Sequence, residues 1–222
     1  MKFFIDTANL EQIKDAQDLG VLDGVTTNPS LMAKEGITGA ENILQHYKDI
    51  CAIVDGDVSA EVIATDFEGM VKEGEALAAL NPQIVVKLPM IKAGVKACKY
   101  FIDKGIKTNV TLVFSVGQAI LAAKAGATYV SPFIGRLDDI GENGVNLIKD
   151  IRKVFDNYKY LKTKILSASI RNIDHVKDVA KAGSDIATIP AKVFHEMYKH
   201  ELTDKGLKKF LDDWKSVNLE IS

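Results

Sequence analysis

The chain has 222 residues, of which 47% are hydrophobic and 26% are charged, and its formal net charge at pH 7 is -2. This composition is apolar enough to bury a sizeable core and excludes a disordered chain. The balanced charge gives no basic surface for nucleic acid or an anionic membrane, so we expect small molecules or other subunits as partners. No apolar run reaches the ~18 residues of a membrane span, and the first residues do not resemble a signal peptide, which predicts a cytoplasmic protein.

Short apolar or β-branched runs recur along the chain and predict strands. They cover residues 2–6, 24–27, 58–63, 84–88, 108–113, 128–133, 164–169 and 186–189. Segments with helical periodicity separate these runs. A capping box at residues 65–68 opens one such helix, which extends to Leu80. Another covers residues 172–182 and ends before Gly183.

The alternation of strands and helices predicts parallel strands joined by right-handed crossovers. An open doubly wound sheet and a closed (β/α)8 barrel both satisfy this pattern. Eight repeats in a chain of this length favour the barrel. The segment after the first predicted strand also lacks the glycine-rich phosphate loop of a nucleotide-binding sheet. No shift in composition marks a second domain, so we predict a single (β/α)8 TIM barrel over residues 1–222.

Residues 203–217 predict one further helix after the last strand. Its apolar residues fall on a single stripe, formed by Leu207, Phe210, Leu211 and Trp214. A stripe of this kind needs a surface to cover. The sequence leaves two candidates open, namely the barrel of the same chain and a neighbouring subunit.

Lys87 lies in the apolar run of residues 84–88, which is typical of a strand buried on both faces. Burying an unpaired ammonium costs several kcal/mol or more, and the common relief is to hold the amine neutral. A neutral buried amine is a nucleophile for carbonyl groups. The alternative is a structural lysine at a strand end whose charged group reaches water.

Polar side chains end or follow almost every predicted strand. They are Asp6, Asn28, Glu61, Lys87, Asn109, Thr111, Ser131, Arg136, Ser169 and Arg171. Each alone is compatible with a helix cap, a turn or a surface charge. In a barrel, however, the carboxyl ends of the strands converge on one mouth, where catalytic residues gather. Because alternate strand residues share a face, Phe133 should point the same way as Ser131, and Thr111 the same way as Asn109.

Arg136, Ser169 and Arg171 follow the sixth and seventh predicted strands and suit a phosphate, since guanidinium groups give bidentate contacts. Metal chemistry is not indicated. None of the four histidines has the spacing of a ligand set, and we predict no metal and no cofactor. Cys51 and Cys98 fall in helical segments without a zinc or disulfide pattern, so we expect reduced core thiols.

Six ordered motifs make the chain resemble the small-subunit transaldolases, relatives of the fructose 6-phosphate aldolases in the class I aldolase group. They are FIDTA at residues 4–8, GVTTNPS at 24–30, VVKLP at 85–89, NVTLVFS at 109–115, SPFIGR at 131–136 and ASIR at 168–171. The resemblance covers essentially the whole chain. It implies that Lys87 forms a Schiff base, that Asp6 is the acid/base, and that Glu61 and Thr111 hold a catalytic water. It also implies further binding residues: Asn28 and Asn109 for the hydroxyls of a dihydroxyacetone unit, Ser131 in the same site, and Arg136, Ser169 and Arg171 for the phosphate.

The resemblance leaves two related activities. The aldolase members of the family tend to carry Gln and Tyr where this chain has Glu61 and Phe133, so we expect a transaldolase. It would move a dihydroxyacetone unit from fructose 6-phosphate or sedoheptulose 7-phosphate to erythrose 4-phosphate or glyceraldehyde 3-phosphate, in the non-oxidative pentose phosphate pathway. A fructose 6-phosphate aldolase that releases free dihydroxyacetone is the alternative, and a non-catalytic sugar-phosphate-binding barrel is a remote one. The resemblance also implies a homo-oligomer, typically a decamer that exchanges the C-terminal helix.

Overall fold

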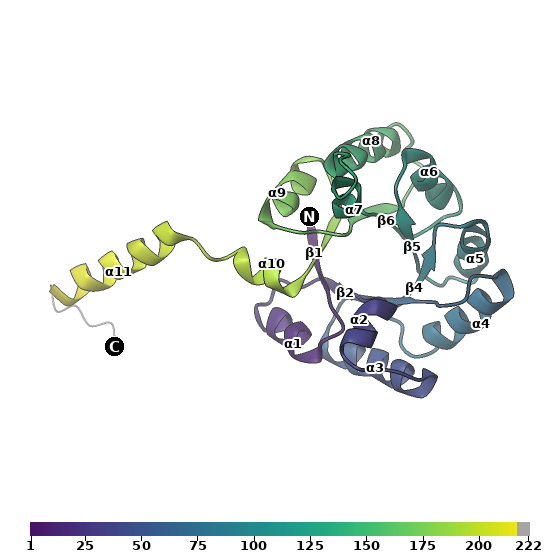
Figure 1. Cartoon of the computed structure of the whole chain (residues 1–222), viewed down its shortest axis with the longest axis horizontal. Helices are drawn as coiled ribbons and strands as arrows, with labels where there is room; N and C mark the ends of the chain where they lie inside the picture. The colour runs from purple at the N-terminus through teal and green to yellow at the C-terminus, as the bar shows by residue number, and fades with distance from the viewer. Residues whose placement is uncertain (217–222) are drawn as a thin grey trace.

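The computed structural model describes residues 1–216 and contains a closed barrel of parallel strands in the order β1 to β8, surrounded by helices (Figure 1). The strands are β1 Lys2–Asp6, β2 Gly24–Thr26, β3 Asp57–Glu61, β4 Ile84–Pro89, β5 Thr108–Val113, β6 Tyr129–Pro132, β7 Lys164–Ser167 and β8 Ile186–Ile189. The barrel closes because β1 pairs with both β2 and β8. The predicted fold class, a (β/α)8 barrel with an additional C-terminal helix, is confirmed.

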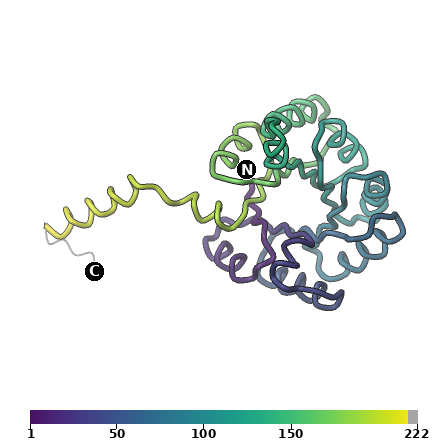
Figure 2. The backbone as a smooth tube through the Cα atoms, in the orientation of Figure 1, coloured from purple at the N-terminus to yellow at the C-terminus, as the bar shows by residue number. Residues whose placement is uncertain are grey.

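The backbone trace in Figure 2 shows helices surrounding the barrel. The described residues contain ten helices before the C-terminal one. They are α1 Leu10–Asp18, α2 Pro29–Lys34, α3 Ala40–Ile53, α4 Phe67–Ala78, α5 Lys92–Asp103, α6 Val116–Lys124, α7 Ile134–Asp138, α8 Gly144–Asp156, α9 Ile173–Lys181 and α10 Ala191–Glu196. Side chains such as Asn9, Ser115 and Asn172 cap helix starts by accepting a hydrogen bond from a backbone N–H of the first turn.

The apolar core has two parts. The larger part lies between the strands and the helices, as expected for a parallel sheet covered by helices. The smaller part fills the lower interior of the barrel and is formed by Phe4, Val85, Tyr129, Leu166, Ala168 and Ile186. The rings of Phe4 and Tyr129 meet edge to face there, with centroids 5.9 Å apart. This packed layer fills the barrel toward the amino ends of the strands. The polar residues at the carboxyl ends therefore face an open space.

Several predicted boundaries differ from the structure because local hydrogen bonds end the strands early. The predicted strand at 58–63 ends at Glu61, since the backbone N–H groups of Ile63 and Ala64 turn to the Glu73 carboxylate. The helix predicted from the capping box at residues 65–68 is capped by Asp66, whose carboxylate accepts from the Gly69 N–H. The predicted strands at 24–27, 128–133 and 164–169 also end one or two residues early.

The last described helix, α11 Glu201–Ser216, extends away from the barrel (Figures 1 and 2). It begins two residues before the predicted start, and Val217, the predicted end, lies outside the described residues. No residue of α11 is buried, and Phe210 of the predicted stripe is 70% exposed. The stripe therefore does not pack on its own barrel in the structure, and packing on a neighbouring subunit stays a prediction.

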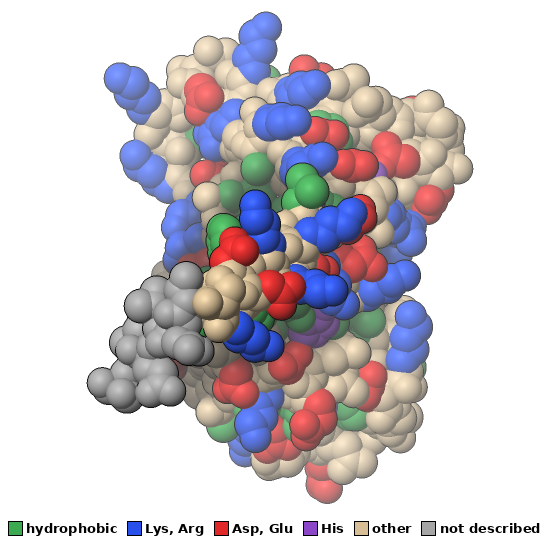
Figure 3. Space-filling view, turned by 90° about the vertical axis from the view of Figure 1, so that its left-hand side faces the viewer, with side chains coloured by type: hydrophobic (Ala, Val, Ile, Leu, Met, Phe, Trp, Pro, Cys, Tyr) green, Lys and Arg blue, Asp and Glu red, His purple; other side chains and the backbone are tan. Residues whose placement is uncertain are grey.

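Figure 3 views the side of the molecule from which α11 projects and shows acidic and basic side chains interspersed, with hydrophobic side chains between them. Both cysteines are buried free thiols, Cys51 in α3 and Cys98 in α5. Within residues 1–216, no helix has both the length and the apolar character needed to cross a bilayer.

Candidate active site

A cavity of about 560 Å³ opens at the carboxyl end of the strands. All but one of the predicted site residues line it: Asp6, Asn28, Glu61, Lys87, Thr111, Ser131, Phe133, Arg136, Ser169 and Arg171. They come from β1, from β3 to β6 and from the segments after β2, β6 and β7. The barrel thus gathers residues that are up to 165 positions apart, from Asp6 to Arg171, into one space.

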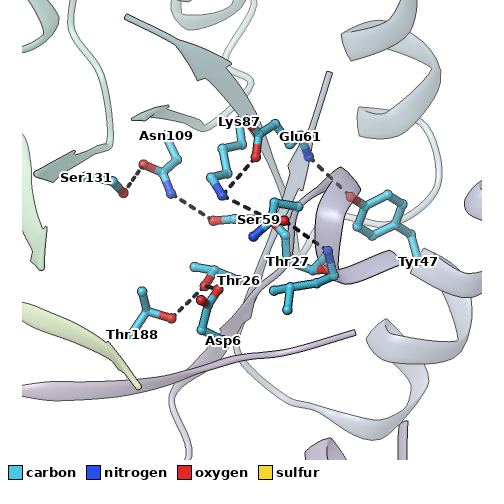
Figure 4. A network of polar contacts seen from close by, with 12 residues as sticks. Asp6, Thr26, Thr27, Tyr47, Ser59, Glu61, Lys87, Asn109, Ser131 and Thr188 are labelled. Carbon is cyan, nitrogen blue, oxygen red and sulfur yellow. Dashed lines mark hydrogen bonds and ion pairs between the residues drawn. The ribbon is translucent and has the colours of Figure 1, made fainter. Parts of the chain in front are cut away.

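Lys87 lies on β4 and is only 4% exposed. Its Nζ is 3.0 Å from Glu61 Oε2 and donates a hydrogen bond of 3.1 Å to the carbonyl oxygen of Thr27 (Figure 4). The amine therefore has a carboxylate partner, because Glu61 stands directly opposite Lys87 in the register of β3 and β4. A buried carboxylate in contact with the amine compensates its charge and can also accept its proton.

Asp6, the last residue of β1, accepts a 2.7 Å hydrogen bond from the hydroxyl of Thr26. The Thr26 and Thr188 hydroxyl oxygens are 2.6 Å apart. Because the Thr26 proton is used toward Asp6, Thr188 must be the donor of this second bond. Burial raises the pKa of Asp6 above its ordinary value, while the charge of Lys87 and the bond from Thr26 oppose that rise. This carboxyl is thus held in one orientation and is easier to protonate than an exposed aspartate.

Asn109 is the predicted site residue that does not line the cavity, and it is completely buried. Its amide nitrogen donates to Ser59 at 3.1 Å, and its amide oxygen accepts from the Ser131 hydroxyl at 2.7 Å. Ser131, which Figure 4 shows bonded to Asn109, does line the cavity. The structure therefore places Asn109 one layer behind Ser131, where it fixes the direction of that hydroxyl.

Thr111 is buried beside the cavity, and its hydroxyl oxygen has no hydrogen-bond partner within residues 1–216. A buried hydroxyl without a partner is uncommon in native proteins and is usually bonded to water or a ligand. The next residue, Leu112, has a φ of 60°, where the register between β5 and β6 shifts. This irregularity turns Leu112 into the cavity as well, so the alternation expected from a regular strand does not extend past Thr111.

The opposite wall of the cavity carries the predicted cations. Arg136 lies on α7, with its guanidinium 5.0 Å from the centre of the Phe133 ring. Arg171 lies in the turn after β7 and pairs with Asp139 at 2.8 Å. Both arginines are exposed, whereas Ser169 is half-buried, lines the cavity and has a φ of 59°. These groups can donate several hydrogen bonds to an anion at the rim of the cavity.

Asn28 serves two purposes at once. Its side-chain oxygen accepts from the Leu31 N–H and caps α2, and it also lines the cavity. Asp6 and Ser169, for which a capping alternative was open, cap no helix, because the neighbouring caps are Asn9 and Asn172.

Sequence reasoning missed the supporting hydroxyls Thr26, Thr188 and Ser59 and the phenol of Tyr47, whose oxygen accepts from the Glu61 N–H at 3.3 Å. Thr188 had a usable signal, because it is the polar residue in an otherwise apolar buried strand, as Lys87 is in β4. Tyr47 had none, since an aromatic residue on an amphipathic helix normally indicates core packing.

Comparison with known proteins gives consistent matches along the chain. The sequence model of the family described as transaldolase/fructose-6-phosphate aldolase matches residues 3–221. A probable transaldolase from Bacteroides thetaiotaomicron is 67% identical, over 98% of this chain and 100% of the relative. Those from Porphyromonas gingivalis and Flavobacterium psychrophilum are 63% and 65% identical, over 98% of this chain and 99% and 100% of the relatives.

A solved structure of thiamine phosphate pyrophosphorylase from Pyrococcus furiosus is also similar, with a TM-score of 0.60 over 86% of this chain and 85% of that one. Its sequence identity is only 16%, so it supports the barrel fold alone. The family match and the relatives, in contrast, agree in sequence over nearly the full length. This chain belongs to the transaldolase/fructose-6-phosphate aldolase family.

Proposed function

We propose that the protein transfers a dihydroxyacetone unit from a ketose phosphate to an aldose phosphate through a Schiff base on Lys87. Its family membership makes it an enzyme of the transaldolase type. The observation that best supports the detailed proposal is the buried ion pair of Lys87 and Glu61 in a cavity whose rim carries Arg136 and Arg171. The pair supplies a nucleophile with its base, and the rim supplies a site for phosphate.

The first step is formation of the Schiff base. Glu61, at 3.0 Å, is placed to take a proton from the Lys87 ammonium. The freed amine adds to the C2 carbonyl of fructose 6-phosphate, and loss of the C2 oxygen as water leaves an iminium. The hydroxyl of Thr111, which lacks a partner in the described residues, can hold this water together with Glu61. The same water is in place for the later hydrolysis.

The second step breaks the bond between C3 and C4. Asp6 takes the proton of the C4 hydroxyl, and the electrons of the broken bond move to the iminium nitrogen and form an enamine. Glyceraldehyde 3-phosphate then leaves. Protonated Asp6 later returns its proton to the aldehyde oxygen of the acceptor while the new carbon–carbon bond forms. The raised pKa of Asp6 suits this exchange, because the protonated form must persist between the two half-reactions.

Substrate binding divides between the two walls of the cavity. Asn28 and Ser131 face the site of the three-carbon unit and can hold its hydroxyls. We assign Asn109 an indirect part through Ser131, because its amide is already bonded to Ser131 and Ser59. Ser169 and the two arginines would bind the phosphate of donor and acceptor in turn.

Phe133 bears on the choice between transfer and aldol cleavage. Its ring lines the cavity between Ser131 and the arginine rim and offers no hydrogen bond to a water near the enamine. An apolar wall of this kind slows protonation of the enamine and leaves it to wait for an aldehyde. This supports a transaldolase over a fructose 6-phosphate aldolase.

The test is the fate of the three-carbon unit. With fructose 6-phosphate as donor, addition of erythrose 4-phosphate should give sedoheptulose 7-phosphate and glyceraldehyde 3-phosphate, with little free dihydroxyacetone in its absence. Release of dihydroxyacetone as fast as transfer would favour the aldolase. No turnover with any ketose phosphate, but binding of it, would favour the non-catalytic barrel.

The proposal extends to the setting of the enzyme. We propose that it exchanges three-carbon units between sugar phosphates in the non-oxidative pentose phosphate pathway and that it acts in the cytoplasm. We also propose that α11 packs on a second copy of the chain, because Leu207, Phe210, Leu211 and Trp214 are all exposed in the single chain. Removing residues 203–222 should lower the mass of the assembly in light scattering, and an unchanged mass would contradict this.

A further inference from the structure

The helix α7 and the turn after β7 form one hydrogen-bonded unit at the rim of the cavity. The backbone N–H of Ile134 donates to Ala168 at 3.0 Å, and that of Gly135 donates to Ser169 at 3.1 Å. α7 carries Arg136, whereas the turn carries Ser169 and Arg171. The three groups of the predicted phosphate site therefore keep their relative positions only while these two segments stay joined.

The turn is held in an unfavourable backbone conformation. Ser169 has a φ of 59°, and residues other than glycine seldom adopt the left-handed region because it strains the backbone. The two segments also approach closely, since a Cβ added to Gly135 would lie 2.3 Å from the Ser169 carbonyl oxygen and 2.7 Å from Arg171 Nε. Contacts from the surroundings must keep the turn in this form.

One such contact comes from α9, the helix that follows the turn. The backbone N–H of Arg171 donates to His175 Nδ1 at 3.3 Å, and His175 Nε2 lies 3.1 Å from Asp138 Oδ2. Because an amide N–H can only donate, Nδ1 must be the unprotonated nitrogen of the ring, and Nε2 carries the proton that Asp138 accepts. Asp138 is fixed in turn, because its other oxygen accepts from the Gly144 N–H at 2.9 Å.

We propose that His175 and Asp138 are positioning residues that hold the turn carrying Ser169 and Arg171 in the form that receives a substrate phosphate. This inference rests on the proposed function, because it takes the rim as the phosphate site. The His175 side chain is only 16% exposed, so water competes little for its bonds. The pair of Arg171 and Asp139 cannot replace it, since both side chains are more than half exposed and such pairs contribute little.

The experiment compares His175→Leu with His175→Asn. Leucine removes both ring contacts, while the side-chain oxygen of asparagine can replace Nδ1 as the acceptor for the Arg171 N–H. His195 on α10 offers a matched control. Its Nε2 lies 3.2 Å from Asp15 Oδ2 on α1, and it does not line the cavity. Fructose 6-phosphate and fructose serve as donors, with unphosphorylated erythrose as the common acceptor, so that both donors give sedoheptulose as the transfer product.

We expect His175→Leu to raise the KM for fructose 6-phosphate about tenfold while kcat changes less than about twofold, because a misplaced turn weakens binding and leaves Lys87 intact. The kinetics with fructose should stay unchanged. His175→Asn should recover a large part of the loss, and His195→Leu should leave the preference for the phosphorylated donor as it is. Equal losses for both donors, or the same result from His195→Leu, would overturn the inference.

A spectroscopic measurement serves if His175→Leu fails to fold. In the wild-type enzyme labelled with ¹⁵N-histidine, His175 should show a protonated Nε2 and an unprotonated Nδ1, and inorganic phosphate should shift the Nδ1 signal. The opposite tautomer would overturn the inference. A wild type that uses fructose as well as fructose 6-phosphate would instead contradict the phosphate site of the proposed function.

Discussion

The floor and the rim of the cavity are built differently. At the floor, Lys87 and Glu61 lie on strands, are nearly buried and form an ion pair with each other. At the rim, Arg136 and Arg171 lie on a short helix and a turn and are exposed to solvent. Charges act more strongly at the floor, because water does not screen them there. The floor is therefore suited to the reacting bonds, and the rim to reversible capture of an anion.

This difference separates the expected effects of substitutions. A change at the floor should act on kcat, because it removes a group that takes part in bond making or breaking. A change at the rim should act on KM, because it removes a contact made equally in the ground state and the transition state.

The largest effect is expected for Lys87→Met. It removes the nucleophile and replaces it with an apolar chain that suits the buried strand, so the protein should fold while turnover falls by about 10⁴-fold or more. Lys107→Met is the matched control, because Lys107 pairs with Asp57 and does not line the cavity. For both variants, the transfer assay measures turnover and thermal unfolding measures folding. Near-normal turnover of Lys87→Met would contradict the Schiff base.

Asp6→Asn should lower kcat by about 10²- to 10⁴-fold, because the acceptor for the C4 hydroxyl proton is lost. The amine is still present, so borohydride should still trap substrate on the protein. A variant that releases glyceraldehyde 3-phosphate at nearly the wild-type rate would remove Asp6 from its acid/base role.

Arg171→Ala should raise the KM for fructose 6-phosphate by about ten- to a hundredfold, the range that follows from a charge-assisted hydrogen bond of about 1.5–3 kcal/mol. The kinetics with unphosphorylated fructose should change little, because Arg171 lies at the rim, whereas the reacting carbons bind at Lys87. Steady-state kinetics with both donors measure the difference, and equal losses would place the phosphate elsewhere.

Phe133→Tyr should raise the release of free dihydroxyacetone relative to transfer by several fold, because the added hydroxyl can orient a water toward the enamine. Glu61→Gln, added to it, should raise the ratio further, since it changes how the catalytic water is held. The measurement is the ratio of free dihydroxyacetone to sedoheptulose 7-phosphate, with and without erythrose 4-phosphate. An unchanged ratio would mean that Phe133 does not control the fate of the enamine.

The smallest effect is a gain in stability for Asp6→Asn at neutral pH. Burial raises the pKa of Asp6 above 3.8, so the folded protein holds this proton to higher pH than the unfolded chain. The contribution of Asp6 to the free energy of unfolding therefore falls as the pH rises from 3.8 through the raised pKa, and asparagine avoids this loss. Thermal unfolding should show a higher midpoint for the variant at pH 7 and a smaller difference near pH 4, and the reverse order would contradict a raised pKa.

Much of the barrel could be predicted because its signals are local. The eight apolar runs and the intervening helical periodicity specify parallel strands, and polar residues at strand ends then fall at one mouth. The ion pair of Lys87 and Glu61 could not be predicted in this way, because it depends on the register between β3 and β4. The left-handed conformations of Leu112 and Ser169 were also hidden, since neither residue type signals a positive φ.

The position of Asn109 illustrates the same limit. Alternation predicts that it shares a face with Thr111, and both are buried on β5, but only Thr111 reaches the cavity. How deep a residue lies in the barrel depends on strand stagger, which no local pattern records. The resemblance to a family supplied the residues of the site, whereas their layering came from the structure.

The most direct test of the account is chemical trapping of the intermediate. The wild-type enzyme is incubated with fructose 6-phosphate, reduced with borohydride and analysed by intact mass, with Lys87→Met and Lys107→Met treated in parallel. The account predicts that the wild type and Lys107→Met gain the mass of one reduced dihydroxyacetone unit and that Lys87→Met gains none. An unmodified wild type, or equal labelling of Lys87→Met, would contradict it.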